Sequence, residues 1–343
     1  MSKKVFEYDF RGRKIVVEHG EMAKQANGSV LVRYGDTVVL STVVVKKEAN
    51  LLSDFFPLMV IYQEKLYSVG KIPGGFIKRE GKPTDAATLA ARMIDRPMRP
   101  MFKEGFKNEV QIVNTVLSVD TDNSPELTAM FGSSLCTSIS EIPFDGPIAG
   151  VKVGCINGEF IINPTPKQLE ESTIDLTVAG TKEAINMVEA GAKEVSEDLM
   201  LEALMFGHEA IKELVEFQEK IVAEIGKPDM EYETLEISED FKKEVRLLAE
   251  DDLNYALRIK DKLEKYAAID KVKEDIVERY KLEYEEKLKG KNGVEIYIED
   301  KDGKRKQTLI KQDKVDGEDV KLTIDSNLQQ KLYNELKNDE GLF

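Results

Sequence analysis

The chain has 343 residues, 41% of them hydrophobic, and a formal net charge of −15 at pH 7. This length allows two or three domains with sizeable cores. The acidic charge argues against nucleic-acid binding over the whole surface, so any such binding needs a local positive patch. With two cysteines, Cys136 and Cys155, and two histidines, His19 and His208, a disulfide framework and a four-thiolate zinc site are excluded and a histidine-based triad is disfavoured.

No segment of the sequence is expected to enter a membrane. The first residues, MSKKVFEYDFRGR, lack the apolar core of a signal peptide. The longest apolar run, near residues 38–45, is too short to span a bilayer. We therefore expect a soluble, cytoplasmic protein with no membrane contact.

Alternating patterns predict strands through residues 4–70, in runs rich in Val, Tyr and Phe and separated by Gly. The runs are VFEYDF, KIVVEHG, SVLVRYG, DTVVLSTVVVKK and LMVIYQEKLYS, and the apolar density of VVLSTVVV predicts a central strand. Two more strands are predicted at VQIVNTVLSVD and STIDLTVAGT, with a hairpin turning at Asn157-Gly158. Helices are predicted over 126–139 and 196–226. This mixed order predicts an α+β domain over residues 1–226.

The character of the sequence changes twice after this domain. Pro228 interrupts the chain, and residues 227–280 are then charged and helical in pattern, which predicts a small helical domain with solvated faces. Residues 281–343 predict a hairpin turning at Asp302-Gly303, then a strand at DGEDVKLTID and a helix at SNLQQKLYNELKND.

The most unusual feature is a basic stretch over residues 71–107. It contains nine Lys or Arg residues against four acidic ones, which leaves a local charge of +5 in an acidic chain. Within it, Pro73-Gly74-Gly75 predicts a turn, followed by Phe76, Ile77, Lys78 and Arg79. A ring beside two cations at a loop tip suits single-stranded nucleic acid, because a base stacks on the ring and cations meet phosphates. The alternative is a surface hairpin whose Phe76 and Ile77 side chains are buried in the core.

A helix is predicted to follow this loop. Thr84 is a candidate N-cap, and the helix is expected to run to about Asp95, before Pro97 stops it. The side chains expected to be buried are Leu89, Met93 and Ile94.

Three arginines lie near the end of this helix. Arg92 and Arg96 are four residues apart and share one helix face, and Arg99 lies just past the predicted end. Guanidinium groups match phosphate oxygens, so the three arginines predict a phosphate clamp. The alternative is that they form salt bridges with Asp85 and Asp95.

Several segments resemble the N-terminal half of bacterial polynucleotide phosphorylases, over about residues 1–278. They include FFPLMVIYQEKLYSVGKIPGGFIKREG, ARMIDRPMRP, EIPFDGPIAGV, TVAGTKEAINMVEAGAKEVSE and FGHEAI. The resemblance implies an RNase PH-like core (of the ribosomal protein S5 domain 2-like type), a small helical domain and a ring-shaped homo-trimer. It also implies an activity that uses phosphate and a divalent metal such as Mg²⁺ to degrade RNA from its 3′ end, with release of nucleoside diphosphates.

The resemblance also implies which residues would bind RNA. The family has a loop with two Phe and two Arg at the pore of the ring, which here reads Phe76-Ile77-Lys78-Arg79. One ring is therefore missing and the first cation is a lysine, so stacking is expected to be weaker. The family's arginines that hold RNA match Arg92, Arg96 and Arg99.

The resemblance implies that catalysis takes place in a second core, which lies outside this sequence. In the family, this catalytic core has two Asp residues that bind the metal and a Lys. The matching positions here are Leu169, Asp175 and Thr177.

The family's catalytic core also binds phosphate with a Ser-rich turn before a helix. In this chain that turn contains Asp120, Asp122 and Glu126, which would repel phosphate, and Gly132-Ser133-Ser134 is expected to lie inside the helix. We therefore expect no catalytic residue and no metal site, and we expect that Mg²⁺ and phosphate do not bind this chain.

The last segment resembles a different family. Residues 281–343 are similar to the linker and the first transpeptidase strand and helix of class B penicillin-binding proteins, through LEYE, Leu288, Gly290, Gly293 and DVKLTIDSNLQ. This predicts a chimera joined near residues 276–281. The motif Ser68-x-x-Lys71 is interpreted as a coincidence, because it lies inside a segment that resembles polynucleotide phosphorylases.

Three hypotheses for function remain open. The chain supplies RNA binding to a phosphate-dependent exoribonuclease and lacks the catalytic core. Alternatively, it is a catalytically silent RNA-binding or assembly module, or a fragment of a cell-wall protein.

Overall fold

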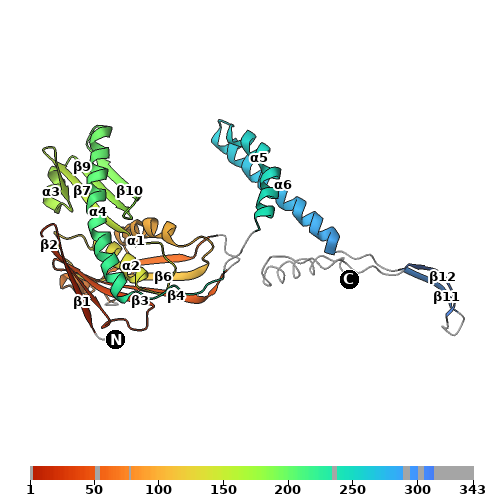
Figure 1. Ribbon diagram of the computed structural model, residues 1–343, viewed down its shortest axis with the longest axis horizontal. Coiled ribbons are helices and arrows are strands. Elements are labelled where there is room, and N and C mark those ends of the chain that lie inside the picture. Colours follow the sequence, from red (N-terminus) through yellow and green to blue (C-terminus); the bar gives the residue numbers. More distant parts are fainter. Residues whose placement is uncertain are drawn as a thin grey trace. The chain divides into compact units, whose positions relative to one another are not determined.

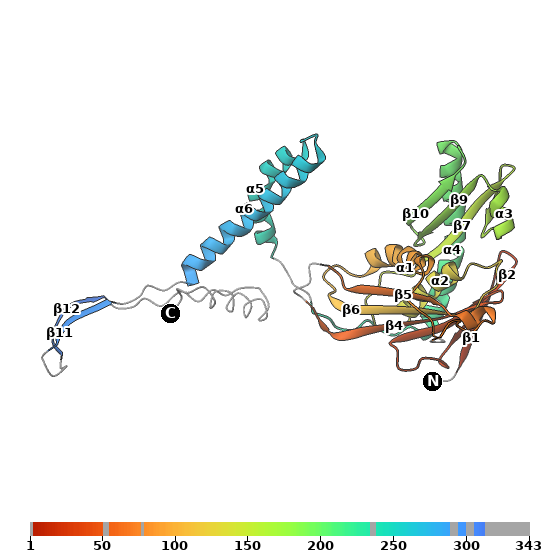
Figure 2. The same ribbon diagram turned by 180° about the vertical axis from the view of Figure 1, so that it is seen from behind.

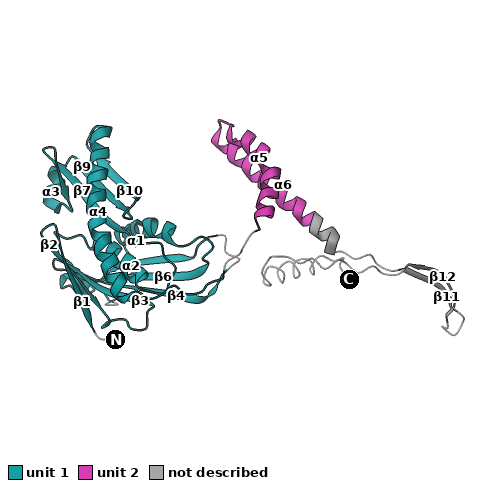
Figure 3. Ribbon diagram, viewed as in Figure 1, with its two compact units in different colours: residues 1–234 teal, residues 235–343 magenta. Residues whose placement is uncertain are grey.

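The computed structural model describes residues 3–50, 55–76, 79–233 and 238–288, with side chains as far as residue 282, and the backbone of two strands at 294–299 and 305–312. The chain divides into two compact units, Met1–Thr234 and Leu235–Phe343 (Figure 3). The predicted division into 1–226, 227–280 and 281–343 stays a prediction.

A six-stranded sheet forms the base of the first unit (Figures 1 and 2). Its strands are β1 (Lys4–Phe10), β2 (Arg13–His19), β3 (Gly28–Tyr34), β4 (Thr37–Ala49), β5 (Leu58–Glu64) and β6 (Asn108–Ser118), in the order β1-β2-β3-β4-β6-β5. Only the β5–β6 pair is parallel. As the apolar run predicted, β4 is interior: Leu40 pairs with Leu31 on one side and with Thr115 on the other. β5 is an edge strand, which places the basic stretch that follows it at that edge.

A smaller antiparallel sheet completes the β-structure of this unit. Its strands are β7 (Ala149–Ile156), β8 (Glu159–Ile162), β9 (Ile174–Gly180) and β10 (Ile185–Ala192), in the order β10-β9-β7-β8. Asn157 and Gly158 both have positive φ, at 52° and 84°, as a tight two-residue hairpin requires. The hairpin predicted at these residues is therefore confirmed.

The helices of the first unit are α1 (Asp85–Met98), α2 (Pro125–Ser138), α3 (Pro166–Glu171) and α4 (Glu197–Ile225), with short 3-10 turns η1 (Leu66–Val69) and η2 (Arg99–Met101). α2 packs between the two sheets, against β3, β4, β6 and β7, while α1 packs on β5 and α4 on β7 and β9. A Cβ on Gly132 of α2 would lie 2.2 Å from Ser41 Oγ, so only glycine allows this close approach. Gly132-Ser133-Ser134 therefore lies inside the helix, as predicted.

The second unit contains two helices, α5 (Glu239–Leu257) and α6 (Lys262–Leu288), which pack against each other. The rings of Phe241 and Tyr280 lie 5.3 Å apart, so the start of α5 meets the end part of α6 and the helices are antiparallel. β11 (Val294–Glu299) and β12 (Arg305–Gln312) pair antiparallel, as the predicted hairpin requires, and its turn at Asp302-Gly303 lies outside the described residues. The strand and helix predicted at 316–339 lie outside the described residues.

Two predictions about α1 are wrong. The helix continues past Asp95 to Met98 with Pro97 inside it, and the Arg99 N–H still donates to Asp95 O, so the helical hydrogen bonds resume directly after the proline. Leu89 is 64% exposed, whereas Ile94 is fully buried. Leu89 and Ile94 are five positions apart, so their side chains point in directions about 140° apart around the helix axis. The buried face is formed by Ala87, Ala90, Ile94, Pro97 and Met98. Burial of Ile94 is therefore confirmed, and Met93 is partly buried against the core.

Besides the short turns η1 and η2, of which η1 replaces the end of the strand predicted at LMVIYQEKLYS, one strand and one helix were not predicted. β10 has a single buried residue, Met187, and a series of small or acidic residues after it, so it lacks the alternation that identifies strands. α3 has six residues, too few for a helical period, although Thr165 and Gln168 form a capping box that could have indicated it. α6 runs through residues 276–281, where the chimera junction is predicted. Among the described residues, no helix combines the length and apolar character needed to cross a membrane.

Candidate nucleic-acid interface

The loop between η1 and α1 carries Phe76, the aromatic residue predicted to stack on a base. Phe76 is fully exposed, and it follows Gly75, whose φ of +77° forms the turn expected there. Burial of Phe76 in the core, the alternative left open by the sequence, is therefore wrong. Ile77 and Lys78 lie outside the described residues.

Both ends of this loop are tied to one residue, Leu66. The Lys71 N–H donates to Leu66 O at 2.9 Å, and the Leu66 N–H donates to Glu80 Oε1 at 2.8 Å. Glu80 Oε2 also pairs with Lys65 Nζ at 3.1 Å. The Leu66 amide, and after it Lys65, holds the pKa of Glu80 below its usual range. This anchoring role of Glu80 was not predicted, because a lone Glu after Lys-Arg gives no sequence signal for it.

The loop is surrounded by exposed cations. Lys71, Arg79 and Lys82 are all exposed, and Arg79 lies next to the anchored Glu80. The fully exposed ring therefore lies on a segment with positive charge on both sides, which is the combination that binds single strands.

Helix α1 begins as predicted. Thr84 Oγ1 accepts the Ala87 N–H at 3.1 Å and so caps the helix. Arg92 and Arg96 are both exposed and lie on one helix face. Within the described part of the chain, Arg92 makes no hydrogen bond or ion pair, whereas Arg96 pairs with Glu189 on β10.

Arg99, in contrast, is part of the structure of the fold. Its guanidinium donates to both carboxylate oxygens of Asp95, at 3.1 and 2.7 Å. It also donates to Phe56 O at 2.8 Å and to Leu58 O at 3.1 Å, and it lies 5.9 Å from the ring centre of Phe56. These contacts tie the end of α1 to the start of β5.

The three arginines therefore differ in how freely they can meet a ligand. The predicted alternative, a salt bridge with Asp95, describes Arg99. Arg96 uses Glu189 instead of the expected acids, because β10 lies beside α1. Their assignment to RNA binding stays a prediction.

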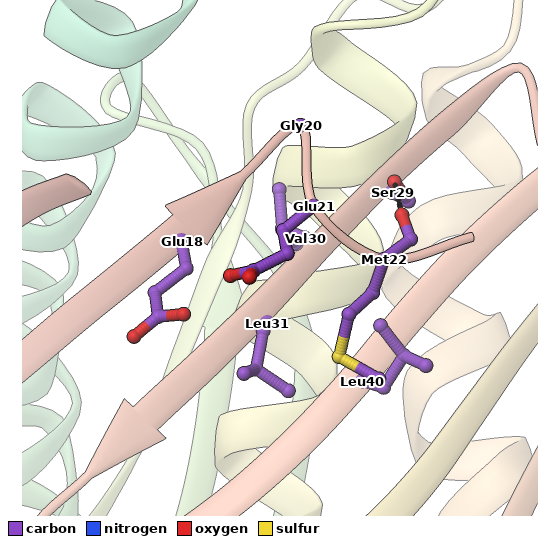
Figure 4. Close-up of a pocket in the computed structure, with 8 residues that line it drawn as sticks. All are labelled: Glu18, Gly20, Glu21, Met22, Ser29, Val30, Leu31 and Leu40. Atoms are coloured by element: carbon purple, nitrogen blue, oxygen red, sulfur yellow. Dashed lines mark hydrogen bonds between the residues drawn. The ribbon is translucent and has the colours of Figure 1, made fainter. Parts of the chain in front are cut away.

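Two small cavities lie elsewhere in the described part of the first unit. One has a volume of about 10 Å³ and is bordered by Glu18, Glu21, Met22 and Leu40 (Figure 4). The other has about 20 Å³ and an apolar lining that includes Phe10 and Leu214. Each has room for about one water molecule, so neither holds a nucleotide. The exposed loop and helix face remain the candidate site.

Comparison with known proteins decides the family. The model "3' exoribonuclease family, domain 1" matches residues 11–143, "3' exoribonuclease family, domain 2" matches 146–210, and "Polyribonucleotide nucleotidyltransferase, RNA binding domain" matches 240–319. Polyribonucleotide nucleotidyltransferase of Enterococcus faecalis is 61% identical over 284 residues, covering 83% of this chain and 40% of the relative. The Bacillus velezensis protein is 59% identical over 281 residues, covering 82% of this chain and 40% of the relative.

The chain belongs to the polyribonucleotide nucleotidyltransferase family. It spans about 40% of the length of these curated relatives and matches their N-terminal region. The α+β, RNase PH-like fold expected from the sequence is confirmed. The third match includes part of the segment that resembles penicillin-binding proteins, and the chimera stays a prediction.

Two solved structures have weaker similarity. Rice (Oryza sativa) Rrp46 has 13% identity and a TM-score of 0.48, covering 64% of this chain and 94% of that chain. A chain of the Archaeoglobus fulgidus exosome with RNA bound to the active site has 17% identity and a TM-score of 0.47, covering 61% and 88%.

The turn before α2 is closed by its own residues. Asp120 accepts hydrogen bonds from the Asp122 N–H at 3.0 Å and from Asn123 Nδ2 at 2.6 Å. The hydrogen bond from the Asp122 N–H is the main cause that holds the pKa of Asp120 below its usual range. Ser124 Oγ caps α2 through the Leu127 N–H and donates to Glu126. An incoming phosphate would therefore meet carboxylates at this helix N-terminus and compete with its cap.

The three positions that the resemblance aligns with the family's catalytic core do not form a metal site among the described residues. Asp175 on β9 pairs with Lys152 Nζ at 3.2 Å, Thr177 is buried, and Leu169 lies in α3. No cluster of three candidate ligands occurs among the residues described. Since Mg²⁺ prefers carboxylate oxygens and water, these residues do not fit it.

Proposed function

We propose that this chain is the RNA-guiding first core of a phosphate-dependent 3′→5′ exoribonuclease. It binds single-stranded RNA and directs it toward a second core, which performs phosphorolysis. Membership of the polyribonucleotide nucleotidyltransferase family supports this function.

The observation that carries the proposal is the exposed Phe76 between cations. A fully exposed phenylalanine ring is unfavourable in water. Arg79 follows Phe76 by three positions in the sequence, so the segment supplies both the ring that a base needs and the charge that a phosphate needs. Base stacking tolerates any sequence, as an enzyme that degrades RNA progressively requires.

The helix face of Arg92 and Arg96 would continue the path. The Arg96–Glu189 pair joins side chains that are 49% and 61% exposed, so it is weak and an RNA phosphate can replace it. Arg99 would act as a positioning residue, because its donors already bind Asp95 and two carbonyls.

Binding without turnover is expected of this chain. The family implies phosphate and Mg²⁺, but Asp175 has a lysine partner and the turn before α2 is acidic. Purified chain, incubated with poly(A), phosphate and Mg²⁺, is expected to release no nucleoside diphosphate above a no-protein control. Phosphate-dependent release would overturn this part of the proposal.

RNA binding is tested by filter binding of a labelled oligoadenylate to the full chain. Phe76→Ala is expected to weaken binding about fivefold or more, since each stacked base contributes about 1–3 kcal/mol. Val5→Ala is the matched control, because Val5 is an exposed apolar residue on β1, the opposite edge of the same sheet. An unchanged affinity in Phe76→Ala, or no binding by the unaltered chain, would contradict the proposal.

We also propose a homo-trimer, on the basis of the family resemblance. Light scattering after gel filtration would then give three times the chain mass of 38.7 kDa. A single-chain mass at micromolar concentration would refute it.

A further inference from the structure

The turn η1 forms a fixed base under the loop that carries Phe76. Both ends of the loop reach Leu66, through the Lys71 amide and the Glu80 carboxylate. η1 is itself bound to the large sheet, because the Val119 N–H, next to β6, donates to Ser68 O at 3.3 Å. The residue between these two anchored positions is Tyr67.

Tyr67 is held in place but its side chain is open to solvent. Its carbonyl accepts the Gly70 N–H at 3.0 Å, which closes the turn, and the side chain is 55% exposed. Among the described residues, no ring or guanidinium stacks on Tyr67. The turn has no buried residue, so the packing of the core does not explain an aromatic side chain here.

Tyr67 also lies within reach of the loop tip. Phe76 and Glu80 are four positions apart in the sequence, so their Cα atoms are at most about 14 Å apart. Glu80 is hydrogen-bonded to Leu66, the neighbour of Tyr67. The exposed cations Lys71 and Arg79 lie at the two ends of the loop, next to this turn.

We propose that Tyr67 is a second base-stacking platform for single-stranded RNA, at the foot of the loop whose tip carries Phe76. A base stacks on the Tyr67 ring, and the neighbouring phosphates meet Lys71 and Arg79. This inference rests on the proposed function.

The test measures the affinity of the full chain for oligoadenylate by fluorescence anisotropy, and stacking by the quenching of 2-aminopurine placed at successive positions. Tyr67→Ala is expected to weaken binding about fivefold or more and to reduce quenching at one position. Tyr67→Phe keeps the ring and is expected to retain both. Val69→Ala is the matched control, because Val69 lies in the same turn and is 54% exposed.

The outcomes separate this inference from the proposed function. If Phe76→Ala weakens binding and Tyr67→Ala does not, the inference is wrong and the proposed function stands. If the unaltered chain does not bind, or Phe76→Ala binds normally, the proposed function fails. If Tyr67→Phe loses as much affinity as Tyr67→Ala, the ring is not the platform and the inference is wrong. Equal melting temperatures of all variants show that the losses are not due to unfolding.

Discussion

The loop and the helix of the basic stretch use similar residues in opposite ways. In the loop, the ring of Phe76 and the cations beside it face solvent. At the end of α1, the guanidinium of Arg99 donates hydrogen bonds to Asp95 and to two backbone carbonyls. A count of positive charges treats both regions alike. The difference shows that a cation is available to a ligand only where the fold leaves its donors without partners, or with weak ones.

The largest expected effect is a loss of stability in Arg99→Ala. This change removes the Arg99 donors of Asp95 and of the Leu58 carbonyl, and it leaves the Phe56 carbonyl with the Leu58 N–H alone. The expected cost is about 1–2 kcal/mol after allowance for the partial exposure of the pair. Urea denaturation measures it as a lower midpoint at constant slope. Arg92→Ala is the control and is expected to change the free energy of unfolding by less than about 0.5 kcal/mol. Equal losses in the two variants would remove the distinction between the two regions.

Next in size is the effect of Arg92→Gln and of Arg96→Gln on RNA binding. Each is expected to lower affinity by up to about fivefold, because an exposed ion pair contributes at most about 1 kcal/mol. Each also reduces the slope of log affinity against log salt by about 0.7, the value for one phosphate contact to a single strand. Arg33→Gln is the control, since Arg33 is an exposed arginine on β3 that points away from the helices. An unchanged salt slope in both variants would exclude this helix face from the RNA path.

The sequence predicted the scaffold of this site better than its contacts. Alternation identified β4 and β6, and helical periodicity identified α4. The fate of Phe76 stayed open, because an apolar residue beside cations fits a buried hairpin and an exposed tip equally well. The partners of Arg99 could not be read, because Phe56 and Leu58 lie about forty residues away and contribute backbone atoms. Backbone carbonyls have no sequence signature.

A smaller effect of opposite sign is expected in Glu189→Gln. This change releases Arg96 from its ion pair, so the Arg96 guanidinium becomes free to meet an RNA phosphate. Affinity for oligoadenylate is expected to rise about twofold, with little change in stability, because both partners are exposed. The double variant Glu189→Gln, Arg96→Gln serves as the control and should show no gain over Arg96→Gln alone. A fall in affinity would indicate that Glu189 positions Arg96 for RNA instead of competing with it.

The smallest effect concerns the anchor of the loop and is visible only in acid. The pKa of Glu80 is lowered from its usual value of 4.5 by the Leu66 amide and Lys65. Because the charged form is favoured in the folded state, the anchor is fully present above about pH 4.5 and is lost as the pH falls through the lower, folded-state pKa. The amide proton shift of Leu66, followed by NMR, should therefore titrate below pH 4.5 and stay constant from pH 5 to 8. In Glu80→Gln this titration should disappear, and a shift that persisted would show that another carboxylate holds the loop.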